Sequence, residues 1–173
     1  MILGRVGKLD RLAAPAVYLA YPLPKIIFLP VILTLFGVGD FSKVFLISII
    51  VFFQVLVAAR DAARQVNKGV IDSVISLGAT DFQVYRHVIF PACLPKILTA
   101  LRIGLGTAIA VLFFSETVAN RTGIGYYLMD AWARFAWDEM FAGVIAMGVM
   151  GFVFYLFLDW MERKLCPWQF KSQ

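Results

Sequence analysis

The chain has 173 residues, of which 61% are hydrophobic and 15% aromatic, and its mean hydropathy is strongly positive. This composition places the chain among membrane proteins rather than soluble domains of the same length. The formal net charge of +5 would suit nucleic-acid binding, but the basic residues are scattered at the ends of apolar segments. They form no single basic stripe, which argues against that class.

Four apolar segments follow one another along the chain. The first is broken by prolines, and its last part, residues 26–36, is predicted to be a short span or half-span. Residues 41–59, 95–118 and 140–158 are predicted to be full spans, since about 20 apolar helical residues cross a bilayer core of ~30 Å. The sequence therefore predicts an all-α polytopic membrane protein with about four spans, forming a single transmembrane domain over residues 1–173.

Residues 67–91, between the second and third spans, predict two short helices joined by a tight turn. Gly78 suits the left-handed position that ends the first helix, where a side chain is expected to clash with the turn. Thr80 and Gln83 have the spacing of a capping box for the second helix, and Pro91 is expected to end that helix. An ordered hairpin of this kind is typical of a surface that one protein offers to another.

Lys and Arg residues fall mainly on one side of the predicted spans. If the N-terminal segment, the hairpin and the C-terminal tail share a side, the other side holds only Lys43, Arg121 and Arg134 of the 16 basic residues. By the positive-inside rule, the hairpin and both chain ends are predicted to be cytoplasmic.

The hairpin resembles the EAA loop of permease subunits in ATP-binding-cassette (ABC) importers. That signature is Glu-Ala-Ala, three residues, Gly, nine residues and Ile-x-Leu-Pro; Gly78 and Val88–Pro91 stand at the matching positions. Asp72-Ser73-Val74 stands in place of Glu-Ala-Ala, which keeps the acid and loses both alanines. The resemblance extends over nearly all of residues 10–168 and is closest to the nitrate/sulfonate/taurine-type permeases. Such permeases usually have further spans at the N-terminus, so the chain is expected to be short at that end.

The resemblance implies a permease subunit in a prokaryotic cell (inner or plasma) membrane that dimerises with a second permease copy. It also implies two cytoplasmic ABC ATPases and an extracytoplasmic solute-binding protein as partners, besides membrane lipid. The hairpin would act as a lever between ATPase and spans, with Val74, Leu77, Phe82 and Val84 as apolar contacts and two aspartates as charged ones. Asp72 has an alternative role as a partner of its helix dipole. The residues expected to couple to the ATPase are Asp72, Ser73, Val74, Leu77, Gly78, Ala79, Thr80, Asp81, Phe82 and Pro91.

No residue pattern in the sequence suits catalysis, a metal ion or a cofactor. His87 is the sole histidine, no phosphate-binding Gly-x-x-x-x-Gly-Lys loop is present, and Cys93 and Cys166 are interpreted as small apolar residues. Glu116, after Ser115, lies near the outer end of an apolar helix. Either these two residues line the translocation path or a gate, or Glu116 is solvated at the interface.

Two other classes of function stay open at this point. The first alternative to an importer subunit is a truncated, inactive membrane scaffold that binds an ATPase without forming a path. The second is a channel or transporter that works without ATP. The identity of the solute is not defined by the sequence, although nitrate, sulfonates and taurine are the solutes of the permeases it resembles.

Overall fold

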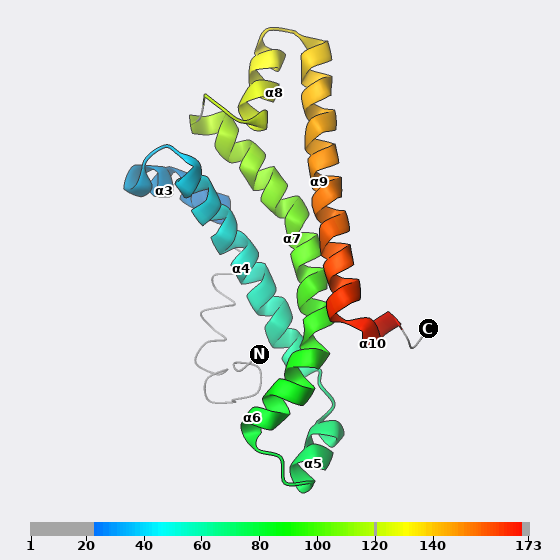
Figure 1. Ribbon diagram of the computed structural model, residues 1–173. Coiled ribbons are helices and arrows are strands. Elements are labelled where there is room, and N and C mark those ends of the chain that lie inside the picture. The colour runs from blue at the N-terminus through cyan, green and yellow to red at the C-terminus, as the bar shows by residue number, and fades with distance from the viewer. Residues whose placement is uncertain (1–22, 120, 171–173) are drawn as a thin grey trace. The chain divides into compact units, whose positions relative to one another are not determined.

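The structure, a computed structural model, describes residues 23–119 and 121–170, and within them every regular element is helical (Figure 1). The predicted all-α fold is therefore confirmed. In chain order the elements are the 3₁₀ turn η1 (Lys25–Phe28), α3 (Leu29–Phe36), α4 (Asp40–Arg64), α5 (Lys68–Ser76), α6 (Asp81–Val84), the π-helical segment η2 (Tyr85–Ile89), α7 (Phe90–Ala119), α8 (Ile124–Ala133), α9 (Trp137–Leu165) and α10 (Pro167–Phe170).

Three helical runs in the described part of the chain are long and apolar enough to cross a membrane: Asp40–Arg64, Asp81–Val118 and Trp137–Leu165. Each extends beyond the span predicted from hydropathy, because a helix continues past the bilayer core into its polar flanks. The first predicted span is shorter. The run Lys25–Phe36 combines a 3₁₀ turn with α3 and is about 20 Å long, less than the ~30 Å core.

The chain divides into two compact units. Among the described residues, the first unit, called here the hairpin unit, contains Leu23, Phe53–Leu101 and residues 159–170; the second, the α8 unit, contains Pro24–Phe52 and Arg102–Leu158. Each unit has an apolar core of its own. The core of the hairpin unit is formed by Ala62, Ala63, Ile71, Val84, Ile89 and Cys93, and that of the α8 unit by Leu29, Ile32, Leu46, Ile50 and Val111.

The helix after the hairpin turn does not end at Pro91, contrary to the sequence prediction. The run continues from α6 through η2 into α7, and Pro91 is the second residue of α7. Proline lacks the N–H that an α-helix would pair with the carbonyl of His87. The π-helical segment just before it widens the turn, with the Phe90 N–H bonded to the Tyr85 carbonyl, so the helix passes the proline without breaking.

Candidate functional site

Gly78 forms the turn of the hairpin in the way the sequence predicts. Its φ is +85°, a left-handed conformation that favours glycine. The Gly78 N–H donates to the Ile75 carbonyl and the Ala79 N–H to the Val74 carbonyl, at 2.9 and 3.3 Å, which is the bonding pattern of a Schellman motif. The expected clash is absent, since a Cβ at Gly78 would meet no atom within 4 Å. The turn therefore requires glycine for its backbone conformation and not for space.

Both hairpin helices are capped at their N-termini by side chains. Asn67 accepts a hydrogen bond from the Gly69 N–H at 2.8 Å and caps α5. Thr80 accepts from the Gln83 N–H, and the Gln83 side chain accepts from the Thr80 N–H at 2.8 Å, so the predicted capping box is confirmed. These bonds satisfy amide groups that a short helix leaves free at its start. The N-termini of both hairpin helices are thus fixed by local hydrogen bonds within this chain.

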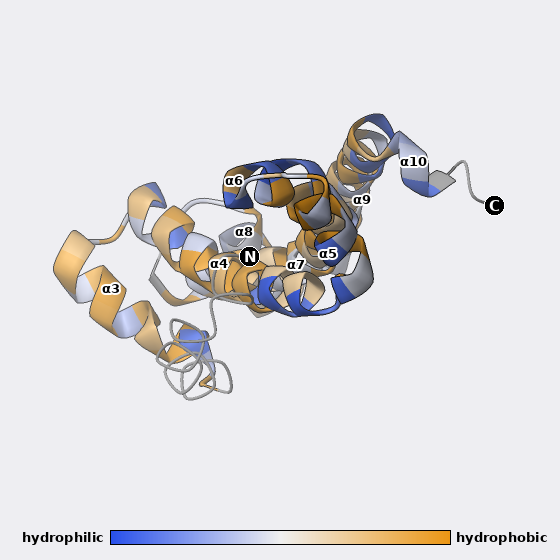
Figure 2. Ribbon diagram, turned by 90° about the horizontal axis from the view of Figure 1, so that it is seen from below, coloured by the Kyte–Doolittle hydropathy of each residue, from blue (hydrophilic) through white to orange (hydrophobic). Residues whose placement is uncertain are grey.

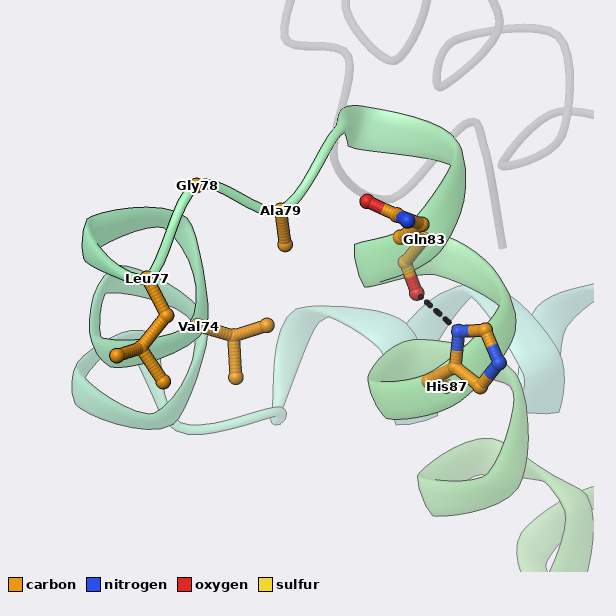
Figure 3. A pocket seen from close by; sticks show the side chains of 6 residues that line it. All are labelled: Val74, Leu77, Gly78, Ala79, Gln83 and His87. Atoms are coloured by element: carbon orange, nitrogen blue, oxygen red, sulfur yellow. Dashed lines mark hydrogen bonds between the residues drawn. The ribbon is translucent and has the colours of Figure 1, made fainter.

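A groove of about 370 Å³ lies on the hairpin between the two helices (Figure 3). Its lining residues are Val74, Leu77, Gly78, Ala79, Gln83 and His87. His87 Nδ1 is 3.1 Å from the Gln83 carbonyl oxygen, which can only accept, so Nδ1 carries a proton. The sequence analysis noted His87 only as the sole histidine and gave no sign that it would line the same groove as Gly78.

Two of the apolar side chains predicted to contact a partner are open to solvent. Leu77 is 87% exposed and Phe82 is 67% exposed, and both were predicted to be partner contacts. Val84, predicted in the same set, is fully buried in the core of the hairpin unit. Periodicity shows that a residue lies on an apolar face but does not show whether its own chain already covers that face. Val84 is therefore a core residue and no partner contact.

The polar residues of the predicted set lie on the outside of the hairpin. Asp72, Ser73 and Asp81 are exposed, and the Ser73 hydroxyl donates to the Gly69 carbonyl at 2.7 Å. Because α5 begins at Lys68, Asp72 lies beyond the first turn, which holds no acidic residue. The dipole of a helix acts on charges within its first turn, so the alternative role for Asp72 is wrong. In Figure 2 the hydrophilic colour on α5 and α6 contrasts with the mainly hydrophobic α3.

The second predicted site, Ser115 and Glu116, is buried at the end of α7. The two residues are 2% and 7% exposed, so Glu116 is not solvated at an interface. The Ser115 hydroxyl donates to the Leu112 carbonyl at 2.8 Å. Glu116 accepts a hydrogen bond from the Gly125 N–H at 2.8 Å, and its Oε1 lies 3.5 Å from Lys43 Nζ.

Lys43 is a buried partner of Glu116 that the sequence analysis did not identify. It is 73 positions from Glu116, and its Nζ also lies 2.8 Å from Asp40 Oδ1. The one sequence signal was a lysine inside an apolar run, at the start of the predicted span 41–59. A charge in such a place needs a partner, but the partner's identity depends on how the helices pack.

The two cysteines play no part in either site. Cys93 and Cys166 are both buried and both free thiols. Burial, together with the negative charge of Glu162, raises the pKa of the Cys166 thiol, which keeps it in the unreactive protonated form.

The membrane-length helices and the capped hairpin between two of them define a polytopic helical membrane protein of the permease class. The chain belongs to the family of binding-protein-dependent transport system inner membrane components, whose model matches residues 1–170. It is accordingly an ABC transporter permease of the binding-protein-dependent type.

Individual relatives agree with this assignment. The chain is 35% identical over 159 residues to the taurine transport system permease protein TauC of Escherichia coli K12, covering 92% of this chain and 58% of TauC. It is 25% identical to the formylaminopyrimidine transport permease protein ThiX of Halalkalibacterium halodurans, covering 95% of this chain and 66% of ThiX. The chain thus spans about three fifths of the length of such relatives.

A solved structure supports the fold. A chain of the MetNI methionine ABC transporter, in an inward-facing conformation, matches with a TM-score of 0.68 at 17% identity. The match covers 92% of this chain and 76% of the other chain.

Proposed function

We propose that this chain is the membrane-spanning subunit of an ATP-driven importer, and that the hairpin of residues 67–91 docks on a cytoplasmic ABC ATPase. The observation that carries the proposal is a capped, internally packed hairpin that leaves Leu77 and Phe82 exposed beside a groove. A loop that merely joined two spans would need neither caps nor a core. Burying a side chain such as Leu or Phe contributes roughly 1.5–3 kcal/mol, so these two provide a substantial part of a docking energy.

The rigidity of the hairpin supports a mechanical role. Val84 and Ile71 pack with Ala62 and Ala63 of α4 and with Cys93 of α7, so a partner that moves the hairpin also moves the ends of two membrane-length helices. Hydrolysis of ATP by a partner would then do work on the spans. Exposed Asp72 and Asp81 are available to pair with basic residues of that partner.

The orientation and the remaining partners belong to the same proposal. The distribution of Lys and Arg supports a cytoplasmic hairpin and cytoplasmic chain ends. A second permease copy would complete the path, and a solute-binding protein on the opposite face would deliver the solute. The taurine permease among the relatives supports taurine or another small sulfonate as that solute. Ser115 and Glu116 would lie beside the path.

The test is a detergent pull-down of the tagged chain from its native membranes, with identification of any ABC ATPase that co-purifies. Gly78→Arg places a long charged side chain in the groove. Gly78→Asn is its matched control, because asparagine tolerates the left-handed conformation and is small. The proposal requires an ATPase with the wild type and with Gly78→Asn, and its loss with Gly78→Arg.

Reconstitution of the purified complex then tests transport. Vesicles that hold the complex and the binding protein should accumulate radiolabelled taurine when ATP is supplied. Uptake without ATP would indicate an independent transporter. No ATPase with a folded wild-type chain would overturn the importer and leave a channel or a scaffold.

A further inference from the structure

The short helix α8 is held at its N-terminus by a carboxylate from another helix. Gly123 occupies the N-cap position with φ +112° and provides no side chain to cap the helix. Glu116 of α7 takes that role, since its Oε2 accepts from the Gly125 N–H at 2.8 Å. A negative charge at this end also complements the helix dipole.

The fit between α7 and α8 leaves no space for larger residues. A Cβ at Gly125 would lie 2.7 Å from the Phe113 carbonyl oxygen and 2.9 Å from Glu116 Cβ, and one at Gly123 would overlap the Glu116 carboxylate. The backbone of the loop therefore rests directly on α7, with Glu116 enclosed between them.

The charge of Glu116 is balanced by Lys43 of α4. The side chains of Lys43 and Glu116 are 8% and 9% exposed, with Nζ 3.5 Å from Oε1. Lys43 also pairs with Asp40 at 2.8 Å, but the Asp40 side chain is 93% exposed. Removing one member of a buried pair leaves a buried charge without compensation, whereas replacing both members is tolerated far better.

The other attachments of α8 are of a different kind. Leu128 packs against α9 at Gly143, where a Cβ would come within 2.7 Å of Leu128 Cδ2. At the C-terminal end, Arg134 bonds to Asp130 at 2.9 Å and Glu139 at 2.6 Å, and these carboxylates raise the pKa of its guanidinium. That cluster is about half exposed, so salt screens it and it contributes little.

We infer that Glu116 is a positioning residue of the transport cycle: its carboxylate seats the N-terminus of α8, and its ion pair with Lys43 is the latch that must open before α8 can move. The inference that α8 moves during transport rests on the proposed function. The contact of Glu116 with the N-terminus of α8 and its ion pair with Lys43 do not depend on that function. While the Glu116 carboxylate keeps both its hydrogen bond to the Gly125 amide and its ion pair with the buried Lys43, it stays in place and holds the N-terminus of α8.

The latch predicts an asymmetry between its two members. In Glu116→Gln the amide oxygen still accepts from Gly125, and Lys43 keeps Asp40 as a partner. In Lys43→Met, Glu116 remains buried and loses its compensating charge. Lys43→Met should therefore release α8 more than Glu116→Gln, and the double variant, which buries no charge at this position, should seat α8 again.

The experiment measures whether the buried face of α8 becomes accessible. Ala131 is 0% exposed and Trp132 is 54% exposed, so Ala131→Cys reports release and Trp132→Cys is the matched control. The full chain is placed in nanodiscs, where both faces meet the reagent, and labelled with a membrane-impermeant maleimide. The chain without a reporter cysteine gives the background from the buried Cys93 and Cys166.

In the Lys43→Met background, Ala131→Cys is expected to label about tenfold faster or more than in the chain with Lys43 and Glu116 intact, and in the Glu116→Gln background the increase should be smaller. In the double variant, Ala131→Cys should label at nearly the rate seen with both residues intact. Trp132→Cys should label at the same rate in every background. Equal labelling of Ala131→Cys with and without Lys43→Met overturns the latch. A double variant that labels as fast as Lys43→Met also overturns it, because loss of packing would then explain the release.

A second arm separates the latch from the importer. When the chain is in complex with its ATPase, the addition of ATP and taurine should speed the labelling of Ala131→Cys. Unchanged labelling in a complex that transports taurine would refute the movement of α8. A chain that binds no ATPase refutes the proposed function, while the nanodisc experiment still decides the latch.

Discussion

Three glycines of this chain allow backbone strain to be separated from steric clash, and the prediction differs for each. Gly78 has a left-handed φ of +85° with open space around its Cβ position. Gly125 has no positive φ, but a Cβ there would lie 2.7 Å from the Phe113 carbonyl oxygen. Gly148, in α9, has neither a positive φ nor an atom within 4 Å of that position.

The magnitudes follow from those environments. Gly78→Ala should cost roughly 1 kcal/mol, the lower part of the penalty for a left-handed residue, since no neighbour has to move. Gly125→Ala should cost more, about 2–3 kcal/mol, because α8 must shift away from α7 and the buried hydrogen bond to Glu116 is lost. Gly148→Ala should be neutral or stabilising by up to about 1 kcal/mol, owing to its better helix propensity.

Amide hydrogen exchange on the full chain in nanodiscs measures all three. Gly78→Ala should speed exchange in residues 67–91 roughly fivefold and leave residues 124–133 unchanged, while Gly125→Ala should show the reverse. Gly78→Asn should behave like the wild type. The reasoning is refuted if Gly78→Asn is as damaging as Gly78→Ala, or if Gly78→Ala disturbs its own segment more than Gly125→Ala disturbs α8.

Three further predictions test the hairpin and the exposed ion-pair cluster at the C-terminal end of α8. Leu77→Glu should leave the hairpin folded, as judged by its exchange, and abolish ATPase co-purification, whereas Val84→Glu should unfold the hairpin because Val84 is 0% exposed. Thr80→Ala should lower the opening free energy of α6 by about 1 kcal/mol, with Thr80→Ser retaining the capping hydroxyl; equal exchange in both variants would contradict the cap. Arg134→Gln should leave maleimide labelling at Ala131→Cys unchanged at physiological salt, and release of α8 by this variant would show that the exposed cluster, not the buried pair, holds it.

The features that the sequence predicted correctly are those decided within a few residues. Gly78 and the Thr80–Gln83 box are confirmed because a positive φ and a cap depend on local backbone geometry. Pro91 was also treated as a local signal, and there the prediction was wrong. The missing N–H of Pro91 can be accommodated either by ending the helix or, as here, by the π-helical segment Tyr85–Ile89, and no residue type in the sequence predicts such a segment.

The features that could not be predicted depend on contacts between distant segments. Glu116 was identified as unusual, yet its partners come from α4 and from the start of α8. A hydropathy pattern places an acid on a helix but does not show which other helix supplies a base. The same limit explains Val84, whose apolar character was visible while its burial against Ala62 and Ile71 was not.

The two sites are linked by the covalent structure of one helical run. Asp81–Val118 carries Phe82 near its first residue and Glu116 near its last, so the proposed docking surface and the proposed seat of α8 belong to the same helical run. The π-helical segment and Pro91 lie between them, and such features are where helices bend. Val84, Ile89 and Cys93, which lie on both sides of Pro91, belong to one apolar core, so the hairpin and the start of α7 are packed together across this irregular segment. If the proposed docking displaces the hairpin, the displacement reaches Glu116 along this run, and separating Glu116 from Lys43 then costs the energy of breaking a buried ion pair.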